Sequence, residues 1–377
     1  MTITNFYAPA FYKKFQCIGS ACSDNCCIGW EIDIDEKTAA AYGNTRGDFG
    51  KRLSQNIALQ PQPHFILKGE RCPFLNSRNL CDIILNLGAH NLCEICDKHP
   101  RFFEWFDGLT ECGLGLCCEQ ACRLLFAEST PLTFESWSAH APENQPNPDD
   151  KLFSVLHEAR TVAFALAQNR TFSLPQRMVL LLCFAEELQQ QIFTDGTNFE
   201  TILNYYRSAD FLKKQLQNQL AAVTPTTQQA WWDSLLALLA AQEPIDETWP
   251  TYLQEITTNL PKLLGRGTAS LFSVPAAYFY EHLLVYFIYR YFLKAAFDGE
   301  VLARIKFACI STVTIALFNA HFTTCKEAAA PVSPLVFATK LYSKQVEYCT
   351  DNLDAFLDES ALNPFFSLDC LIQLFLF

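Results

Sequence analysis

The cysteines of this chain are concentrated near one end, and this limits the folds that the chain can adopt. Twelve of its seventeen cysteines fall between Cys17 and Cys122, in the first third of 377 residues. A chain of this length can bury a core large enough to fold without covalent cross-links. A disulfide framework is therefore not needed, and a reducing cytosol would not maintain one. Metal ligation is the favoured explanation for thiols at this density.

The cysteines form two groups with ligand-like spacing. The first group, Cys17-Ile-Gly-Ser-Ala-Cys22-Ser-Asp-Asn-Cys26-Cys27, places four thiols within eleven residues. In the second group, the two-residue gap of Cys93-Glu-Ile-Cys96 lets both sulfurs face one metal ion from a single turn. With Cys118, the candidate metal ligands are Cys17, Cys22, Cys26, Cys27, Cys72, Cys81, Cys93, Cys96 and Cys118.

The identity of the metal stays open, because zinc and iron–sulfur clusters both accept four thiolates. Nine thiols exceed the need of one such centre, so some could support the site, form a second centre or simply pack. Cys22 and Cys26 have the gap that opens the radical-SAM motif, but Gly29 stands where its third cysteine should be. His99, three residues after Cys96, could bind zinc, although a non-ligating histidine is favoured.

Charge and hydropathy argue against three classes of protein. A formal charge of −12 argues against a nucleic-acid partner, which needs clustered Lys and Arg. The N-terminus shows no basic run followed by an apolar segment, so we expect no secretory signal and a cytoplasmic location. The longest uncharged stretch, 307–325, contains several Ser and Thr residues, and we expect a buried core helix rather than membrane insertion.

Patterning along the chain predicts a mainly α fold with two domains. Residues 1–127 should form an irregular cysteine-rich metal-binding domain, and residues 128–151, with four prolines among polar residues, a linker. Residues 152–377 should form an α-helical domain, with no sustained strand alternation after residue 130. Its predicted helical runs are Leu152–Gln168, Pro175–Phe193, Phe199–Ala222, Thr227–Gln242, Trp249–Leu264, Pro275–Phe297 and Val301–Thr324.

Smaller signals refine this prediction. Ser173 and Ser273 each stand two residues before a proline that can occupy a first helical turn, so both are expected to cap helices. Five isolated cysteines fall in apolar helical patterns and should be small core residues: Cys183, Cys309, Cys325, Cys349 and Cys370.

The cysteine motifs resemble those of a known family. The strings Tyr12-Lys-Lys-Phe15-Gln-Cys17 and Asn25-Cys26-Cys27-Ile-Gly-Trp30 are similar to the opening of bacterial flagellin lysine-N-methylases. The pattern appears more briefly in related small cysteine-cluster proteins. The resemblance covers nearly the whole chain, with its specific motifs within residues 12–123. It continues through Cys72-Pro-Phe-Leu75, Leu80-Cys81, Leu92-Cys93-Glu-Ile-Cys96, Pro100-Arg101 and Tyr280-Glu281-His-Leu-Leu284.

This resemblance implies methyl transfer from S-adenosylmethionine to lysine side chains of flagellin, by a protein that carries a 4Fe-4S cluster. The chain departs from the family pattern near its last clustered thiols. Where the family has Ser-Cys-Pro-Glu-Ala-Ala-Arg, this chain has Cys117-Cys118-Glu-Gln-Ala-Cys122-Arg123. Cys118 keeps the matching thiol, whereas Cys117, Cys122 and also Cys112 are additional, which leaves the ligand assignment there open.

Lysine methylation needs a proton acceptor, because a lysine with a pKa near ~10.4 is protonated at neutral pH. The sequence does not identify this base. Candidate carboxylates are Glu31, Asp33, Asp35 and Glu281, and solvated or capping roles are favoured for each. Gly113-Leu-Gly115 lacks the third glycine of a dinucleotide-type loop and should be a turn, so the cofactor site is expected to be unconventional.

Two other classes of function remain open at this point. The chain could be a non-catalytic protein-binding module organised by zinc or an iron–sulfur cluster, or a redox or metal-delivery protein with exchangeable thiolates. A cluster in the methylase could anchor or reduce the cofactor, or only hold the first domain folded. The sequence does not identify the oligomeric state.

Overall fold

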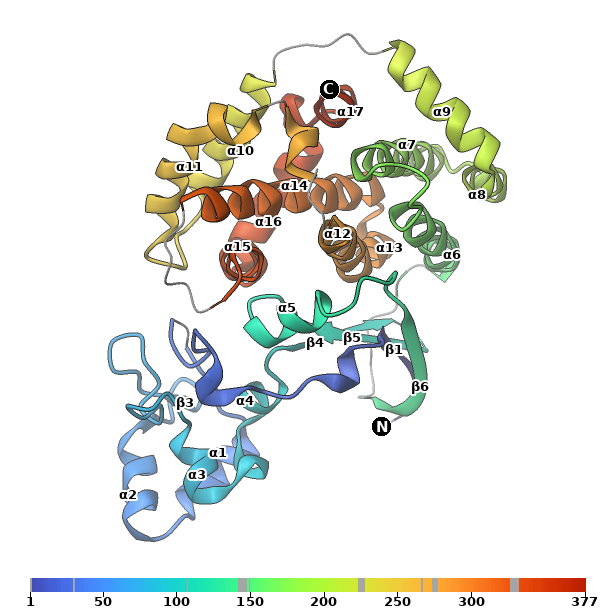
Figure 1. Ribbon diagram of the computed structural model, residues 1–377. Coiled ribbons are helices and arrows are strands. Elements are labelled where there is room, and N and C mark those ends of the chain that lie inside the picture. The colour runs from blue at the N-terminus through green and yellow to red at the C-terminus, as the bar shows by residue number, and fades with distance from the viewer. Residues whose placement is uncertain are drawn as a thin grey trace.

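The computed structural model describes residues 2–29, 31–106, 108–141, 148, 150–222, 228–265, 267–272, 277–325 and 332–377. A large helical domain rests on a small sheet, and a lobe containing most of the clustered cysteines lies beside that sheet (Figure 1). The predicted mainly α fold is confirmed.

The first part of the chain forms the sheet and the cysteine lobe. Its elements are β1 (Thr2–Pro9), α1 (Glu36–Gly43), α2 (Gly47–Gln55), β2 (Ile57–Ala58), β3 (His64–Phe65), α3 (Asp82–Leu87), α4 (Glu94–Lys98), β4 (Arg101–Phe106), β5 (Leu109–Leu114), α5 (Glu119–Leu125) and β6 (Phe134–Ala141).

The rest of the chain forms the helical domain. Its elements are α6 (Asp150–Ala167), α7 (Leu174–Phe193), α8 (Phe199–Arg207), α9 (Ala209–Ala222), α10 (Gln229–Ala241), α11 (Trp249–Leu264), α12 (Tyr278–Tyr291), α13 (Ala295–Asp298), α14 (Val301–Cys325), α15 (Pro334–Tyr342), the π-helical turn η6 (Ser343–Glu347), α16 (Thr350–Leu362) and α17 (Leu368–Leu376).

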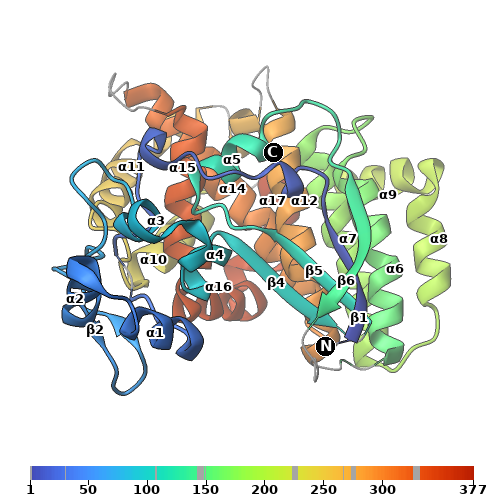
Figure 2. The ribbon, with the colours of Figure 1, turned by 90° about the horizontal axis from the view of Figure 1, so that it is seen from below.

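The four-stranded sheet has the order β4-β5-β1-β6. β1 runs parallel to β5 and antiparallel to β6, and β4 and β5 form a hairpin. Seen from below, the sheet lies across the helices, with α1–α4 to one side (Figure 2). The expectation of no strand after residue 130 is wrong. β6 is an edge strand without sustained alternation; its backbone pairs with β1, and its Trp137 and Phe134 rings stack on Phe6 and Tyr7.

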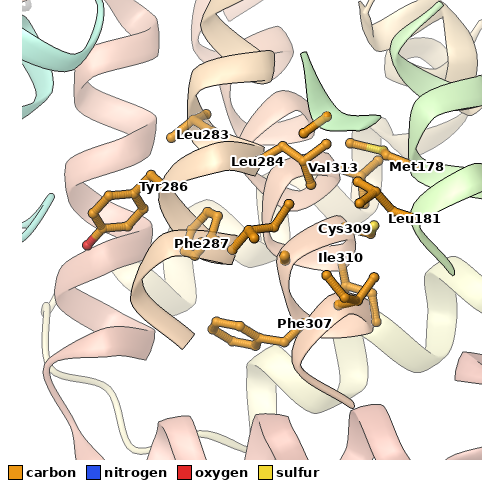
Figure 3. Close-up of a cluster of buried hydrophobic side chains, with 14 of the residues drawn as sticks. Met178, Leu181, Leu283, Leu284, Tyr286, Phe287, Phe307, Cys309, Ile310 and Val313 are labelled. Atoms are coloured by element: carbon orange, nitrogen blue, oxygen red, sulfur yellow. The ribbon is translucent and has the colours of Figure 1, made fainter. Parts of the chain in front are cut away.

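The core of the helical domain is built around α14. By length and composition α14 could span a membrane, but 89% of its most apolar window is buried inside the fold. The expected core helix is thus confirmed, and α7, α12, α15 and α16 pack against it. Figure 3 shows the centre of this packing, formed by Met178 and Leu181 of α7, Leu283, Leu284 and Phe287 of α12, and Phe307, Ile310 and Val313 of α14.

The predicted helices are confirmed, except that two predicted runs are each divided. The run 275–297 is interrupted by a 3-10 turn at Phe292–Lys294, between α12 and α13. Ser173 forms a complete capping box with Gln176 at the start of α7. The predicted run 199–222 is broken at Ser208, whose extended backbone separates α8 from α9. The predicted cap Ser273 lies outside the described residues. The division into domains at 1–127, 128–151 and 152–377 stays a prediction.

The isolated cysteines divide by burial. Cys183 and Cys309 are buried in the helical core, as expected. Cys349 and Cys370 are only half-buried, and the side chain of Cys325 lies outside the described part.

A buried ion pair and two hydrogen bonds connect the sheet to the helical domain. Arg160 on α6 forms a bidentate ion pair with Glu111 on β5, and both side chains are at most 3% exposed. The hydroxyl of Tyr289 on α12 donates to the carbonyl oxygens of Tyr7 at 2.7 Å and Cys112 at 2.9 Å. These contacts fix the sheet, and the cysteine region that continues from it, against the helices.

Candidate metal centre and its surroundings

The structure brings five candidate thiols into one apolar cluster in the cysteine lobe. Cys72 and Cys93 are buried, and Cys27, Cys81 and Cys96 pack against them. The walls of the cluster are the side chains of Ile32, Ile34, Tyr42, Leu53, Phe65, Phe74, Leu75 and Ile83.

Loops that are distant in sequence hold these thiols together. The backbone N–H of Cys72 donates to the carbonyl oxygen of Cys27 at 2.9 Å, which joins the first cysteine group to the second. Within the groups, the thiol of Cys26 is hydrogen-bonded to that of Cys27, and the thiol of Cys93 to that of Cys96. Cys96 is also close enough to Cys27 and Cys72 for their charges to interact.

The remaining candidate thiols lie around this cluster. Cys118 stands at the start of α5, near Cys22 and Cys26. The thiol of Cys22 donates to Glu119 Oε2 at 3.7 Å. Cys17 is exposed, and its Sγ accepts from the backbone N–H of Gly19 at 3.4 Å.

The thiol cluster has the chemistry of a metal site without a preformed geometry. Among the described residues, no group of three or more His, Cys, Asp or Glu side chains is arranged to hold a metal ion. The metal-binding character of this lobe therefore stays a prediction.

The donor set nevertheless fits a soft metal. Burial, and to a smaller extent the neighbouring thiols Cys81 and Cys93, raise the pKa of Cys72 to about 11. Deprotonating several of these thiols together would place repelling charges in an apolar environment. A cation that binds thiolates, such as zinc or the iron of a cluster, would compensate those charges.

Three of the candidate carboxylates lie in the cysteine lobe, and Asp35 caps a helix there. Asp35 accepts the backbone N–H groups of Thr38 and Glu94, both at 2.9 Å. Desolvation raises the pKa of Asp35, but these hydrogen bonds outweigh it and lower the pKa, as expected for a capping acid. Asp33 accepts from the Gln62 amide at 2.8 Å, and Glu31 is exposed.

The fourth candidate, Glu281, is buried and paired with two arginines. Arg170 approaches its carboxylate to 2.7 Å and Arg177 to 2.6 Å. The next residue, His282, bridges the carbonyl oxygens of Leu125 and Thr130. Both residues therefore tie α12 to its neighbours.

The predicted turn at Gly113-Leu-Gly115 is wrong for Gly113, which lies inside β5. Its lack of a side chain makes room for the ring of Phe102 on β4. A Cβ at Gly115 would overlap the hydroxyl of Tyr348, so glycine is needed there for close packing rather than for a cofactor loop. Tyr348 also packs its ring edge-on against His99, with centroids 6.3 Å apart.

A buried polar cluster next to this contact was not predicted from the sequence. Glu347, the last residue of η6, accepts three hydrogen bonds on Oε1: from Arg290 at 2.8 Å, Tyr291 at 2.9 Å and Tyr286 at 3.1 Å. The Tyr286 hydroxyl points away from the apolar packing of Figure 3. Arg290 interrupts the apolar face of α12, and this interruption is the signal by which the cluster could have been found.

The polar cluster borders the cysteine region. The thiol of Cys117 is hydrogen-bonded to the hydroxyl of Tyr348, and Cys117 immediately precedes the candidate ligand Cys118. On α15, which precedes η6, Lys340 forms an ion pair at 3.1 Å with Asp24, in the loop between Cys22 and Cys26. The helical domain therefore contacts the cysteine region through α15 and η6.

Comparison with known proteins identifies a family and three relatives of this chain. The family model of the FliB lysine N-methylase C-terminal domain matches residues 160–374, more than half of the chain. A flagellar biosynthetic protein, FliU of Salmonella muenchen, is 28% identical over 144 residues, which cover 35% of this chain and 85% of that protein.

Two lysine-N-methylases, from Salmonella typhimurium and Salmonella choleraesuis, are each 30% identical over 120 residues. These matches cover 30% of this chain and 30% of each enzyme. No solved structure matches the chain significantly. Because the family model spans most of the helical domain, the chain belongs to the FliB family of lysine N-methylases.

Proposed function

We propose that this protein transfers methyl groups from S-adenosylmethionine to lysine side chains of flagellin in the cytoplasm, and that its cysteine lobe holds a 4Fe-4S cluster. The observation that carries the proposal is the match of residues 160–374 to the lysine N-methylase family. The names of the relatives, two lysine-N-methylases and a flagellar biosynthetic protein, support the reaction and the flagellar substrate.

The cluster would be held by thiols of the apolar group in the lobe. Four of Cys27, Cys72, Cys81, Cys93 and Cys96 suffice for a cluster with four thiolate ligands. When bound, S-adenosylmethionine supplies an activated methyl group, and the cluster would anchor or reduce that cofactor or hold the lobe folded. The contact of α15 and η6 with the cysteine region would place the cluster against the helical domain.

The chain itself must prepare the lysine for reaction. Methylation forms a nitrogen–carbon bond while the sulfur–carbon bond of the cofactor breaks, so S-adenosylhomocysteine leaves and the amine loses one proton. Burial beside aromatic rings lowers the pKa of a lysine amine, and a nearby carboxylate can receive the proton. The polar cluster of Glu347, Tyr286 and Tyr291 offers both features at the border of the cysteine region.

The test is mass spectrometry of flagellin after incubation with S-adenosylmethionine and anaerobically purified protein. We expect mass increases of whole methyl groups on lysines, and none when the cofactor is omitted. An unmodified flagellin under reducing conditions would contradict the proposal. A colourless zinc protein that does not bind S-adenosylmethionine would instead support the non-catalytic binding module.

A further inference from the structure

Helix α15 and the turn η6 carry three buried oxygen atoms on one face. These atoms are Thr339 Oγ1, Ser343 Oγ and Glu347 Oε2, and each has no hydrogen-bond partner within the part of the chain that the structure describes. The three residues are at most 6% exposed. Residues four apart lie one helical turn from each other on the same side, so the atoms form a line, which we name the α15 oxygen row.

Such a row is unusual in a folded protein. A buried polar atom without a partner destabilises the native state, and native structures leave few of them. The other unpartnered side-chain atoms among the described residues lie on other elements of the fold. Three at four-residue spacing along α15 and η6 are explained most simply by a ligand that supplies the missing hydrogen bonds. The row also ends in a π-helical turn, a feature often found at functional sites.

The chemistry of Glu347 determines what such a ligand must carry. Its Oε1 is already occupied by Arg290, Tyr286 and Tyr291, which fix the orientation of the carboxylate. Only Oε2 remains, and a carboxylate oxygen can only accept hydrogen bonds. The ligand must therefore be a donor, and a cationic donor suits the negative charge.

The row ends where the helical domain meets the cysteine region. After burial itself, the charge of Glu347 is among the causes that raise the pKa of Cys117 and of Cys122 on α5. Lys340, the neighbour of Thr339, reaches Asp24 in the cysteine loop. A ligand on the row would thus lie next to the lobe that the proposed function assigns to the cluster.

We infer that Ser343 and Glu347 bind the ammonium group of an amine ligand, while Thr339 hydrogen-bonds a second polar group of the same ligand. Side chains one turn apart are separated by about 6 Å, so a nitrogen between Ser343 and Glu347 can reach both oxygens at about 3 Å. An ammonium group has three donors for these acceptors. The inference rests on the proposed function, which supplies two sources of such a group: the methionine part of S-adenosylmethionine and the lysine to be methylated.

The first test is thermal unfolding of the ligand-free full-length protein. Removing a buried oxygen that has no partner should relieve an unfavourable burial, so Ser343→Ala and Thr339→Val should raise Tm by about 2–4 °C each. Ser360→Ala is the matched control, because Ser360 on α16 is equally buried but donates to the Phe356 carbonyl at 2.8 Å. The control should lower Tm. A fall of Tm in Ser343→Ala as large as in the control would overturn the inference.

The second test is binding. Ser343→Ala should weaken the amine ligand about tenfold, and Glu347→Gln about 10–100-fold, because the latter removes the charge and keeps the size. If the Kd of S-adenosylmethionine measured by calorimetry rises, the ligand is the cofactor amine. If that Kd is unchanged but the KM for flagellin rises by the same factor, the ligand is the lysine. If neither constant changes, the inference is wrong.

These outcomes separate the inference from the proposed function. The wild-type protein could methylate flagellin while Ser343→Ala and Glu347→Gln bind and react normally. This result would support the proposed function and contradict ligand binding by the α15 oxygen row. The wild-type protein could instead bind S-adenosylmethionine through the α15 oxygen row but never modify flagellin. This result would support ligand binding by the row and contradict the proposed function.

Discussion

The ion pair between Glu111 on β5 and Arg160 on α6 makes the attachment of the sheet to the helical domain measurable. Arg160 Nη1 lies 2.7 Å from Glu111 Oε2, and the second guanidinium nitrogen contacts Oε1. Arg160→Met would leave the Glu111 carboxylate buried without its cation. Removing one partner of a buried pair costs about 3–5 kcal/mol, and we expect the free energy of unfolding to fall by this amount.

A double variant separates the pair from its environment. Glu111→Leu combined with Arg160→Met removes both charges, so the free energy of unfolding should return to within about 1 kcal/mol of the wild type or exceed it. Arg207→Met is the matched control, because Arg207 pairs with Glu158 of the same helix α6 with side chains 42% and 57% exposed. Losing that exposed pair should cost less than about 1 kcal/mol.

The assay is urea unfolding followed by circular dichroism, at the same metal content for every variant. If Arg160→Met cost no more than the control, the buried pair would not stabilise the attachment of the sheet. If the double variant were less stable than Arg160→Met alone, the unpaired buried charge would not be the source of the loss.

Three further predictions concern single positions. Cys96→Ala should lose iron and partly unfold the cysteine lobe, whereas Cys370→Ala should keep its iron. Metal analysis checks this, and unchanged iron in Cys96→Ala would show that Cys96 is not a ligand. Gly115→Ala should lower the free energy of unfolding by about 1–3 kcal/mol, because the added methyl overlaps a packed tyrosine. Gly43→Ala is the control, because nothing lies within 4 Å of its new Cβ, and it should not lower the free energy of unfolding. Equal losses in both variants would show that packing against the tyrosine is not the cause. Burial opposes ionisation of Asp246, but hydrogen bonds from its neighbours lower its pKa below 3.8. The ionised carboxylate therefore stabilises the folded state above that pH, and this stabilisation is lost as pH falls through the native pKa. Asp246→Asn should therefore cost about 1 kcal/mol in urea unfolding at pH 7 and nothing in strong acid, and a pH-independent difference would contradict this.

The helices were predictable because their signals are local. Apolar residues at helical spacing predicted a helix over 249–264, the bounds that α11 has in the structure, and the Ser173 cap marked the start of α7. The dense cysteines likewise indicated that Cys27, Cys72 and Cys96 would approach one another, although neither the metal nor the ligand set follows from spacing.

The sheet and the polar cluster were not predictable from local signals. β1 pairs with β6, more than a hundred residues later, through backbone hydrogen bonds that require no sustained alternation in the sequence of this edge strand. Glu347 resembles an ordinary surface acid in the sequence, and only the packing of α12 against η6 buries it beside Arg290. Burial of a polar residue depends on contacts between distant segments, which a periodicity does not report.

Native mass spectrometry of the anaerobically isolated protein would show whether thiols distant in sequence together hold iron. We expect a polypeptide carrying the additional mass of one 4Fe-4S cluster, and loss of that mass in Cys96→Ala. A folded wild-type polypeptide that carries only zinc, or no metal, would contradict this expectation.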